Sequence, residues 1–137
     1  MAVTDWDVLG FGTAAVDELL AVGSFPVPDR KSTLLSVERQ GGGQTATALV
    51  AAARQGVRTA FCCQLGMDEL SLFSLAELEK EGVDCSPCIR LSHGRPYHSF
   101  IIVDRSKNTR TILHQIGNII PPLDAITPEL LGRTRLL

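Results

Sequence analysis

Residues 41–82 read GGGQTATALVAAARQGVRTAFCCQLGMDELSLFSLAELEKEG, and the elements in this stretch set the fold class. A glycine run breaks the chain before residues 45–55, an alanine-rich segment of high helix propensity that another glycine ends. Residues 59–65 are almost all apolar and predict a buried strand. Residues 69–81 are amphipathic, follow Asp68 as a helix N-cap and stop at a glycine. The stretch therefore predicts helix, strand and helix in succession.

The chain before this stretch predicts a further buried strand. Residues 7–12 form a short apolar run that ends in glycine, as a parallel strand does where its carboxyl end opens into a loop. Residues 13–22 are mostly apolar, and residues 32–38 alternate loosely, as a strand can. Strands and helices in alternation favour an α/β layer with parallel strands and right-handed crossovers.

The chain after this stretch changes character. Residues 97–103 and 109–114 are rich in β-formers, and the polar turn between them predicts an antiparallel hairpin. Prolines punctuate residues 121–128, where we expect one short helix, and residues 135–137 resemble the first residues of another strand. A strand cut at its start would leave a sheet edge without pairing partners, so we expect a truncated domain.

The composition is that of one globular domain covering residues 1–137. The 137 residues are 45% hydrophobic and 20% charged, which excludes the disordered and fibrous classes. The longest apolar runs fall far short of the roughly 20 residues that a membrane helix needs. The acidic N-terminus lacks the features of a signal peptide, so we expect a cytoplasmic protein. The net charge of −2 is spread without a basic stripe, which argues against nucleic acid as a partner.

The spacing of cysteine and histidine does not predict a metal site. Four cysteines occur in two groups: Cys62, Cys63, Cys85 and Cys88. A zinc site normally needs two C-x-x-C pairs, or histidines at set spacing, and only one such pair is present. We expect two buried strand cysteines and two loop thiols in a reducing compartment. Three histidines lack an acidic or cysteine partner at catalytic spacing: His93, His98 and His114.

The glycine-rich residues 40–45 stand directly before a predicted helix. Free backbone N–H groups and the positive end of the helix dipole can hold an anion or a substrate oxygen there. The segment is not a P-loop, because the lysine and hydroxyl residue that should follow the last glycine are absent. Residues 10–12 lack the third glycine of a dinucleotide fingerprint. A tight turn that allows close packing of helix on sheet is the alternative explanation of the glycines.

Several motifs follow one another in order along nearly the whole chain. They are the first strand with Gly12 and Asp17, Phe25-Pro26, Gly42-Gly43 with the alanine-rich helix and Gly66, residues 65–69 (LGMDE), residues 78–84 (LEKEGVD) and residues 108–113 (NTRTIL). In this order and spacing they resemble the ribokinase family of carbohydrate kinases, also called the PfkB type. The resemblance identifies the chain with the N-terminal part of such a kinase.

The resemblance implies a ribokinase-like α/β fold, in which a doubly wound, mostly parallel sheet carries a small β lid at about residues 13–38 and 95–115. It implies transfer of the ATP γ-phosphoryl group to a hydroxymethyl group of a sugar or nucleoside, with ATP and Mg²⁺ as cofactors. Such lids close over the sugar and can pair two subunits, so it also implies a homodimer through the lid.

The resemblance assigns substrate binding to four residues: Asp17, Gly42, Gly43 and Thr47. Asp17 matches the family's acidic residue a few positions beyond the first strand, where charge-assisted hydrogen bonds suit sugar hydroxyls. Arg110 matches an arginine that some members, ketohexokinases among them, place towards the ATP phosphates.

The chain departs from the family pattern in two ways. Members carry Gly-Ala-Asn at the helix entry, whereas this chain carries Thr45-Ala46-Thr47, so a hydroxyl replaces an amide with a different set of donors and acceptors. Altered specificity and lost sugar binding both fit this change. The Gly-Ala-Gly-Asp motif, which supplies the catalytic aspartate and the anion hole, belongs to the family's C-terminal half and has no counterpart here.

We therefore expect no catalytic residue and no metal ligand in this chain, and we expect ATP and Mg²⁺ to bind mainly to the missing C-terminal half. The chain alone should be inactive. The alternative is a non-catalytic sugar-binding or regulatory protein that kept the fold. The sequence leaves open which sugar or nucleoside is bound.

Overall fold

A parallel three-stranded sheet forms the centre of the computed structural model, which describes residues 4–137. Its strands are β1 (Trp6–Phe11), β4 (Thr59–Cys62) and β9 (Thr134–Leu136), in the order β4-β1-β9. The first predicted strand therefore occupies the middle of the sheet, with parallel neighbours on both sides. This arrangement confirms the predicted parallel α/β layer.

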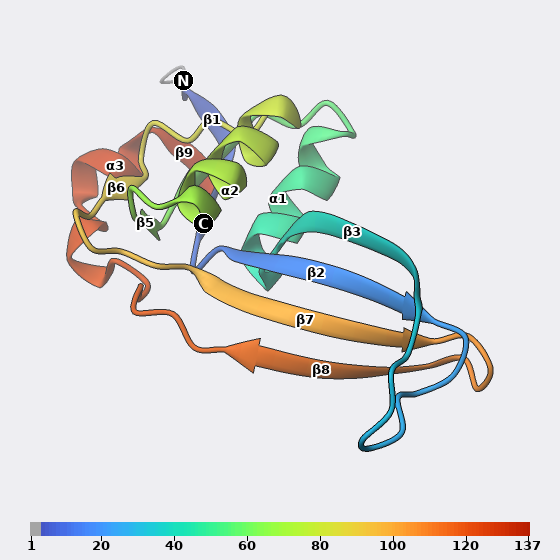
Figure 1. Ribbon diagram of the computed structural model, residues 1–137. Helices are drawn as coiled ribbons and strands as arrows, with labels where there is room; N and C mark the ends of the chain where they lie inside the picture. The colour runs from blue at the N-terminus through green and yellow to red at the C-terminus, as the bar shows by residue number, and fades with distance from the viewer. Residues whose placement is uncertain (1–3) are drawn as a thin grey trace.

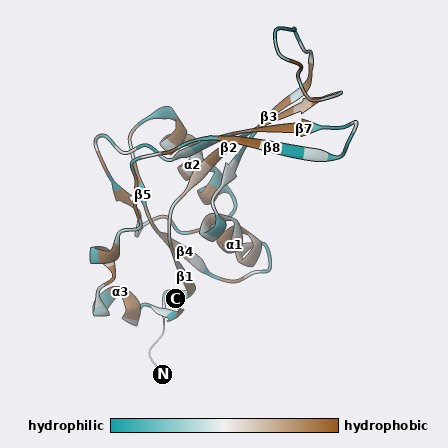
Figure 2. Ribbon diagram, turned by 90° about the horizontal axis from the view of Figure 1, so that it is seen from below, coloured by the Kyte–Doolittle hydropathy of each residue, from teal (hydrophilic) through white to brown (hydrophobic). Residues whose placement is uncertain are grey.

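A second sheet, which we call the outer sheet, has four strands. They are β2 (Ala15–Val22), β3 (Leu34–Gly42), β7 (Tyr97–Asp104) and β8 (Thr109–Gln115), in the order β3-β2-β7-β8. The outer sheet projects away from the helices and the parallel sheet (Figures 1 and 2). Strands β7 and β8 form the predicted antiparallel hairpin, and β2 pairs with β7 in parallel.

Three helices and two short strands complete the fold. They are α1 (Gln44–Ala53), α2 (Glu69–Lys80), α3 (Pro128–Gly132), β5 (Gln64–Leu65) and β6 (Ile89–Arg90), with a 3-10 turn at Leu123–Ala125. Asp68 caps α2 as expected, because its carboxylate accepts a hydrogen bond of 2.9 Å from the Ser71 backbone N–H. None of the helices within residues 4–137 is long and apolar enough to cross a membrane.

The parallel sheet is covered on both faces. Phe61 and Cys63 are fully buried on the face that packs against α1 and α2. Ala60 and Cys62 point the other way, into a second cluster that Leu130 of α3 joins. Successive residues of β4 thus feed two hydrophobic cores, as a buried parallel strand must. In Figure 2, α1 and α3 accordingly lie on opposite sides of β1 and β4, and the fold is doubly wound.

Two boundaries differ from the sequence prediction. The glycines at 41 and 42 do not break the chain before the helix, because both belong to β3, where Gly41 pairs with Val16 and Gly42 with Ala15. Only Gly43 lies between strand and helix. Residues 59–65 form two strands, since β4 ends at Cys62 and the following pair turns to meet β6. Local apolar patterning predicts burial well but does not show where a strand changes its partner.

Candidate functional site

The carboxylate of Asp17 lies directly against the backbone of Gly42. Asp17 stands on β2, half-buried, and faces the edge strand β3. A Cβ atom added at Gly42 would lie 2.5 Å from Asp17 Oδ2, which is closer than any real Cβ contact. Glycine at this position therefore makes room for the carboxylate.

Gly43 joins β3 to α1 in a conformation that suits glycine. Its φ is 98°, in the left-handed range, and an added Cβ would lie 2.7 Å from the Thr13 carbonyl oxygen. Gly43 is also the N-cap of α1 and has no side chain to cap the helix. The first N–H groups of α1 therefore have no side-chain acceptor from the cap, and they form the donor-rich helix end expected from sequence.

A pocket of about 810 Å³ runs along the edge of β3 between α1 and α2. Its lining includes all four residues to which the family resemblance assigns substrate binding: Asp17, Gly42, Gly43 and Thr47. Residues of α2 and its C-cap close the opposite side, among them Ser74, Glu77 and Glu81. The structure thus brings the four residues together, although they come from two strands and a helix.

Thr45 and Thr47 both lie in the first turn of α1, two positions apart, but they have different surroundings. Thr45 Oγ1 donates a hydrogen bond of 3.3 Å to the Phe11 carbonyl oxygen, and its side chain fills the space that a Cβ at Gly10 or Gly12 would need. Thr45 therefore holds α1 close to β1. Thr47 is exposed and lines the pocket. Of the two departures from the family pattern at the helix entry, only Thr47 adds its hydroxyl to the pocket.

A row of polar side chains crosses the outer sheet through Asp17. In the strand register, Gln40 on β3 lies opposite Asp17, Asp17 lies opposite Ser99 on β7, and Ser99 lies opposite His114 on β8. Register partners share a face, with Cβ atoms about 4.5–5.5 Å apart. Among the side-chain hydrogen bonds of residues 4–137, none involves these four side chains. The row can therefore donate to and accept from a ligand rich in hydroxyl groups.

Arg110 shares the face of Asp17 but lies outside the pocket. It pairs with Val103, which in turn lies opposite Ala21, four residues beyond Asp17 on β2. Strand geometry places the two Cα atoms about 16 Å apart, from roughly 3.3 Å per residue and 4.8 Å per strand. The structure therefore does not bring Arg110 to the four pocket residues.

A family model described as pfkB family carbohydrate kinase matches residues 7–120. This chain belongs to that family. It is 29% identical over 128 residues to ketohexokinase of Mus musculus, covering 93% of this chain and 43% of the enzyme. A nucleoside kinase of Methanothermobacter thermautotrophicus is 25% identical over 104 residues, covering 76% of this chain and 34% of that protein.

A solved ribokinase from Thermotoga maritima superimposes with a TM-score of 0.63 at 25% identity, covering 83% of this chain and 37% of that one. The fold is therefore ribokinase-like, as the sequence indicated. The pfkB-family chain spans less than half the length of these relatives. Within residues 4–137, no group of three or more His, Cys, Asp or Glu side chains is placed to hold a metal ion.

The chain also carries a charged cluster on the other face of the outer sheet. Glu18 is only 8% exposed, and its Oε1 accepts a hydrogen bond of 2.6 Å from Arg39 Nε. His98 Nε2 lies 3.2 Å from the same oxygen. Arg39 also bonds Glu69 of α2, and its guanidinium lies 5.5 Å from the centre of the Phe73 ring. The hydrogen bond with Glu18 raises the pKa of Arg39 further, and Arg39 links the outer sheet to α2 through its contacts with Glu69 and Phe73.

Sequence reasoning missed this cluster and the polar row for the same reason. Glu18 and His98 are 80 positions apart, and Asp17 meets Ser99 only because β2 pairs with β7 in parallel. The available signal was the alternation of strand residues, which sends Asp17 and Glu18 to opposite faces. Alternation alone does not predict which residues become their neighbours, because the register between two distant strands cannot be predicted from the local sequence of either strand.

Proposed function

We propose that the chain is the N-terminal, substrate-binding part of an ATP-dependent carbohydrate kinase that transfers the γ-phosphoryl group of ATP to a hydroxyl of a sugar or nucleoside. The observation that carries the proposal is the Asp17 carboxylate, held against Gly42 at a pocket and free of protein donors in the described residues. A carboxylate in that position accepts hydrogen bonds from two neighbouring hydroxyls, and such charge-assisted bonds are stronger than neutral ones.

Each of the other pocket residues has a role in this proposal. Gly42 and Gly43 let the ligand approach the backbone, because neither carries a side chain. Thr47 presents a hydroxyl from the first turn of α1, where the helix N-terminus favours an electron-rich ligand oxygen. Ser99 and His114 extend the polar surface beyond Asp17, which suits a ligand with several hydroxyls.

The chemistry of transfer lies outside this chain in the proposal. ATP and Mg²⁺ would supply the phosphoryl group and neutralise its charge, and they would bind mainly to a C-terminal part that also carries the catalytic residues. Arg110 would contact the ATP phosphates from the far end of the same sheet face. We place the whole protein in the cytoplasm.

The outer sheet would act as the lid, with residues 13–38 and 95–115 as its extent. It also presents exposed apolar side chains on the face opposite the polar row: Val37, Phe100 and Leu113 are 58%, 39% and 56% exposed. Covering them with a second copy would bury apolar surface, which supports a homodimer through the lid.

One observation favours a second candidate, a non-catalytic sugar-binding or regulatory protein of the same fold. Thr47 lies in the pocket where members of the family carry an asparagine, so a threonine hydroxyl stands in place of an amide with two donors. Phosphorylation of any sugar or nucleoside by the whole protein would exclude this candidate.

The test of the proposed function is a kinetic comparison of whole-protein variants. We expect Asp17→Ala to lower kcat/KM for the preferred sugar or nucleoside about 10-fold or more, as losing a charge-assisted hydrogen bond does. Asp124→Asn, an exposed carboxylate on the 3-10 turn, should leave kcat/KM unchanged. Equal kinetics for wild type and Asp17→Ala, across pentoses, hexoses and nucleosides, would contradict the assignment.

A further inference from the structure

Three of the four cysteines meet beside the short sheet of β5 and β6. Cys63 Sγ lies 3.3 Å from Cys88 Sγ. The Cys88 thiol also donates a hydrogen bond of 3.2 Å to the Phe61 carbonyl oxygen. A turn closed by the Cys88 N–H and the Cys85 carbonyl oxygen, 2.9 Å apart, brings the third thiol next to them. The fourth, Cys62, belongs to the core on the other face of β4.

The backbone places Cys63 and Cys88 at disulfide distance. Each precedes a strand of a parallel pair in which Gln64 lies opposite Ile89, and the Ile89 N–H donates to the Cys63 carbonyl oxygen at 2.8 Å. Neighbours in a parallel ladder have Cα atoms about 4.8 Å apart, within the roughly 4.4–6.8 Å that disulfides span. This spacing, with the two Sγ atoms 3.3 Å apart, suits a disulfide between these two residues.

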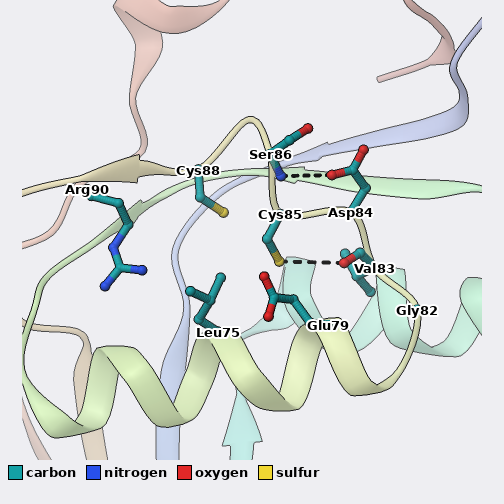
Figure 3. A pocket seen from close by; sticks show the side chains of 9 residues that line it. All are labelled: Leu75, Glu79, Gly82, Val83, Asp84, Cys85, Ser86, Cys88 and Arg90. Atoms are coloured by element: carbon teal, nitrogen blue, oxygen red, sulfur yellow. Dashed lines mark hydrogen bonds between the residues drawn. The ribbon is translucent and has the colours of Figure 1, made fainter.

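A pocket of about 580 Å³ leads to this cluster from the surface. Cys85 and Cys88 line it together with Glu79, Asp84 and Arg90, as Figure 3 shows. Cys63 is fully buried behind them. A small molecule can thus reach Cys88 but not Cys63, and Cys63 is the nearest thiol to Cys88 from within.

We propose that Cys88 and Cys63 form a reversible disulfide by exchange with a low-molecular-weight disulfide that enters this pocket. The Cys88 thiolate attacks one sulfur of the entering disulfide, and one small thiol leaves. The Cys63 thiolate then attacks the Cys88 sulfur of the mixed disulfide, and the second small thiol leaves. Two cysteine thiols are oxidised, one small disulfide is reduced, and the two cysteine protons end on the two released thiols.

The surroundings of the thiols set the order and the pace of the exchange. The hydrogen bond with Cys88, followed by burial, raises the pKa of Cys85. Contact with Cys63, together with burial, also raises the pKa of Cys88, and the neighbouring Cys85 offsets only part of this rise. Because both thiols stay largely protonated at neutral pH, exchange is slow there and accelerates as the pH rises.

The disulfide would also close a covalent loop that contains α2. Cys63 and Cys88 are 25 positions apart, and all of α2 lies between them. A disulfide across this segment lowers the conformational entropy of the unfolded chain, while the folded structure stays the same as in the reduced protein. Oxidised protein should therefore melt at a higher temperature than reduced protein, and a dithiol reductant should reverse the shift.

The test treats the folded chain with glutathione disulfide at several pH values and counts the thiols that remain after denaturation. We expect two of the four thiols to be lost, and we expect the rate of this loss to rise about tenfold for each unit of increase in pH. Peptide mass spectrometry should find Cys63 linked to Cys88. Four surviving thiols would overturn the proposal, as would a link between Cys85 and Cys88. The same linkage at the same rate in the denatured chain would also overturn it, because the folded geometry would then be irrelevant.

Two alanine variants sharpen the result. Cys62→Ala removes the neighbouring buried thiol on the other face of β4 and should still lose two thiols. Cys63→Ala should accumulate one glutathione adduct on Cys88, detected by intact mass, without an internal disulfide. An internal disulfide formed as fast in Cys63→Ala as in wild type would contradict the role of Cys63.

If that variant does not fold, the melting temperature of wild type decides the question. It should rise on oxidation and fall again on reduction, and an unchanged melting temperature counts against the proposal.

Discussion

Asp17 and Gly42 constrain each other at the candidate site. The carboxylate occupies the space that any side chain at position 42 would need, since an added Cβ would lie 2.5 Å from Asp17 Oδ2. The contact involves the mobile end of a side chain, so a larger residue could be accommodated by displacing the carboxylate. Loss of function without loss of the fold is the expected signature of such a change.

Gly42→Ala should separate these two effects. We expect about a 10-fold loss of kcat/KM in the whole protein, because the carboxylate moves, and a stability loss of about 1–3 kcal/mol from local overpacking. Gly23→Ala is the matched control, because an added Cβ there meets nothing within 4 Å. Equal substrate kinetics for Gly42→Ala and wild type would show that the carboxylate position does not matter.

A second residue-scale expectation concerns acid stability. Arg58 donates a side-chain hydrogen bond of 2.9 Å to Asp7 and, with its backbone N–H, holds the pKa of that carboxyl at about 2, below its ordinary value of 3.8. A lowered folded-state pKa gives stability that is complete above 3.8 and lost as the pH falls towards 2. Asp7→Asn should therefore melt below wild type at neutral pH, and the gap should narrow between about pH 4 and pH 2. A gap that stays constant over this range in thermal melts would contradict the assignment.

At the scale of elements, the Arg39 contacts that join the outer sheet to α2 should contribute to the stability of the fold. Glu18 is nearly buried and is paired with Arg39, which also contacts Glu69 of α2. Removing the arginine leaves a buried carboxylate without its charged partner, and that costs more than losing an exposed ion pair.

Urea unfolding measures how much the Arg39 contacts contribute to the free energy of unfolding. We expect Arg39→Gln to lower the free energy of unfolding by about 1–3 kcal/mol. Arg54→Gln breaks the exposed pair with Glu81, two hydrogen bonds of 2.6 Å each, and should cause a much smaller change. If the two variants lose the same stability, the buried cluster has no special role in holding the sheet.

The order of elements was accessible from sequence, whereas their pairing was only partly so. The buried strands, both longer helices, the Asp68 cap and the hairpin after residue 95 all follow from local patterns, and the structure confirms them. The parallel pairing of β2 with β7 joins segments about 80 positions apart and has no local signal. The polar row, the Glu18 cluster and the contact of Cys63 with Cys88 all depend on such long-range register, so they appeared only in the structure.

At the scale of the whole molecule, our proposal makes this chain the substrate-binding side of a larger site. It spans 43% of the length of the mouse ketohexokinase to which it is similar. In the proposed function, Asp17, the glycines and Thr47 bind and orient a hydroxyl-rich ligand, whereas the catalytic base and Mg²⁺ belong to a C-terminal part. Binding and transfer should therefore be separable in experiments.

The chain alone should show no phosphoryl transfer. We expect no magnesium-dependent release of ADP above the background without protein, for any sugar or nucleoside, since positioning and charge neutralisation supply most of the catalysis in this reaction. A reaction without sugar or nucleoside is the matching control for contaminating ATPase. Turnover that follows the chain through two different chromatographic steps would contradict this expectation.

The most direct test of the central claim is a ligand titration of the isotope-labelled chain followed by NMR. We expect one sugar or nucleoside of a panel to shift the amide signals of Asp17, Gly42, Gly43 and Thr47 together, and we expect Asp17→Ala to abolish these shifts. Shifts that cluster elsewhere, that persist unchanged in Asp17→Ala, or that appear with no member of the panel would contradict the claim that this pocket is the substrate-binding part of a carbohydrate kinase.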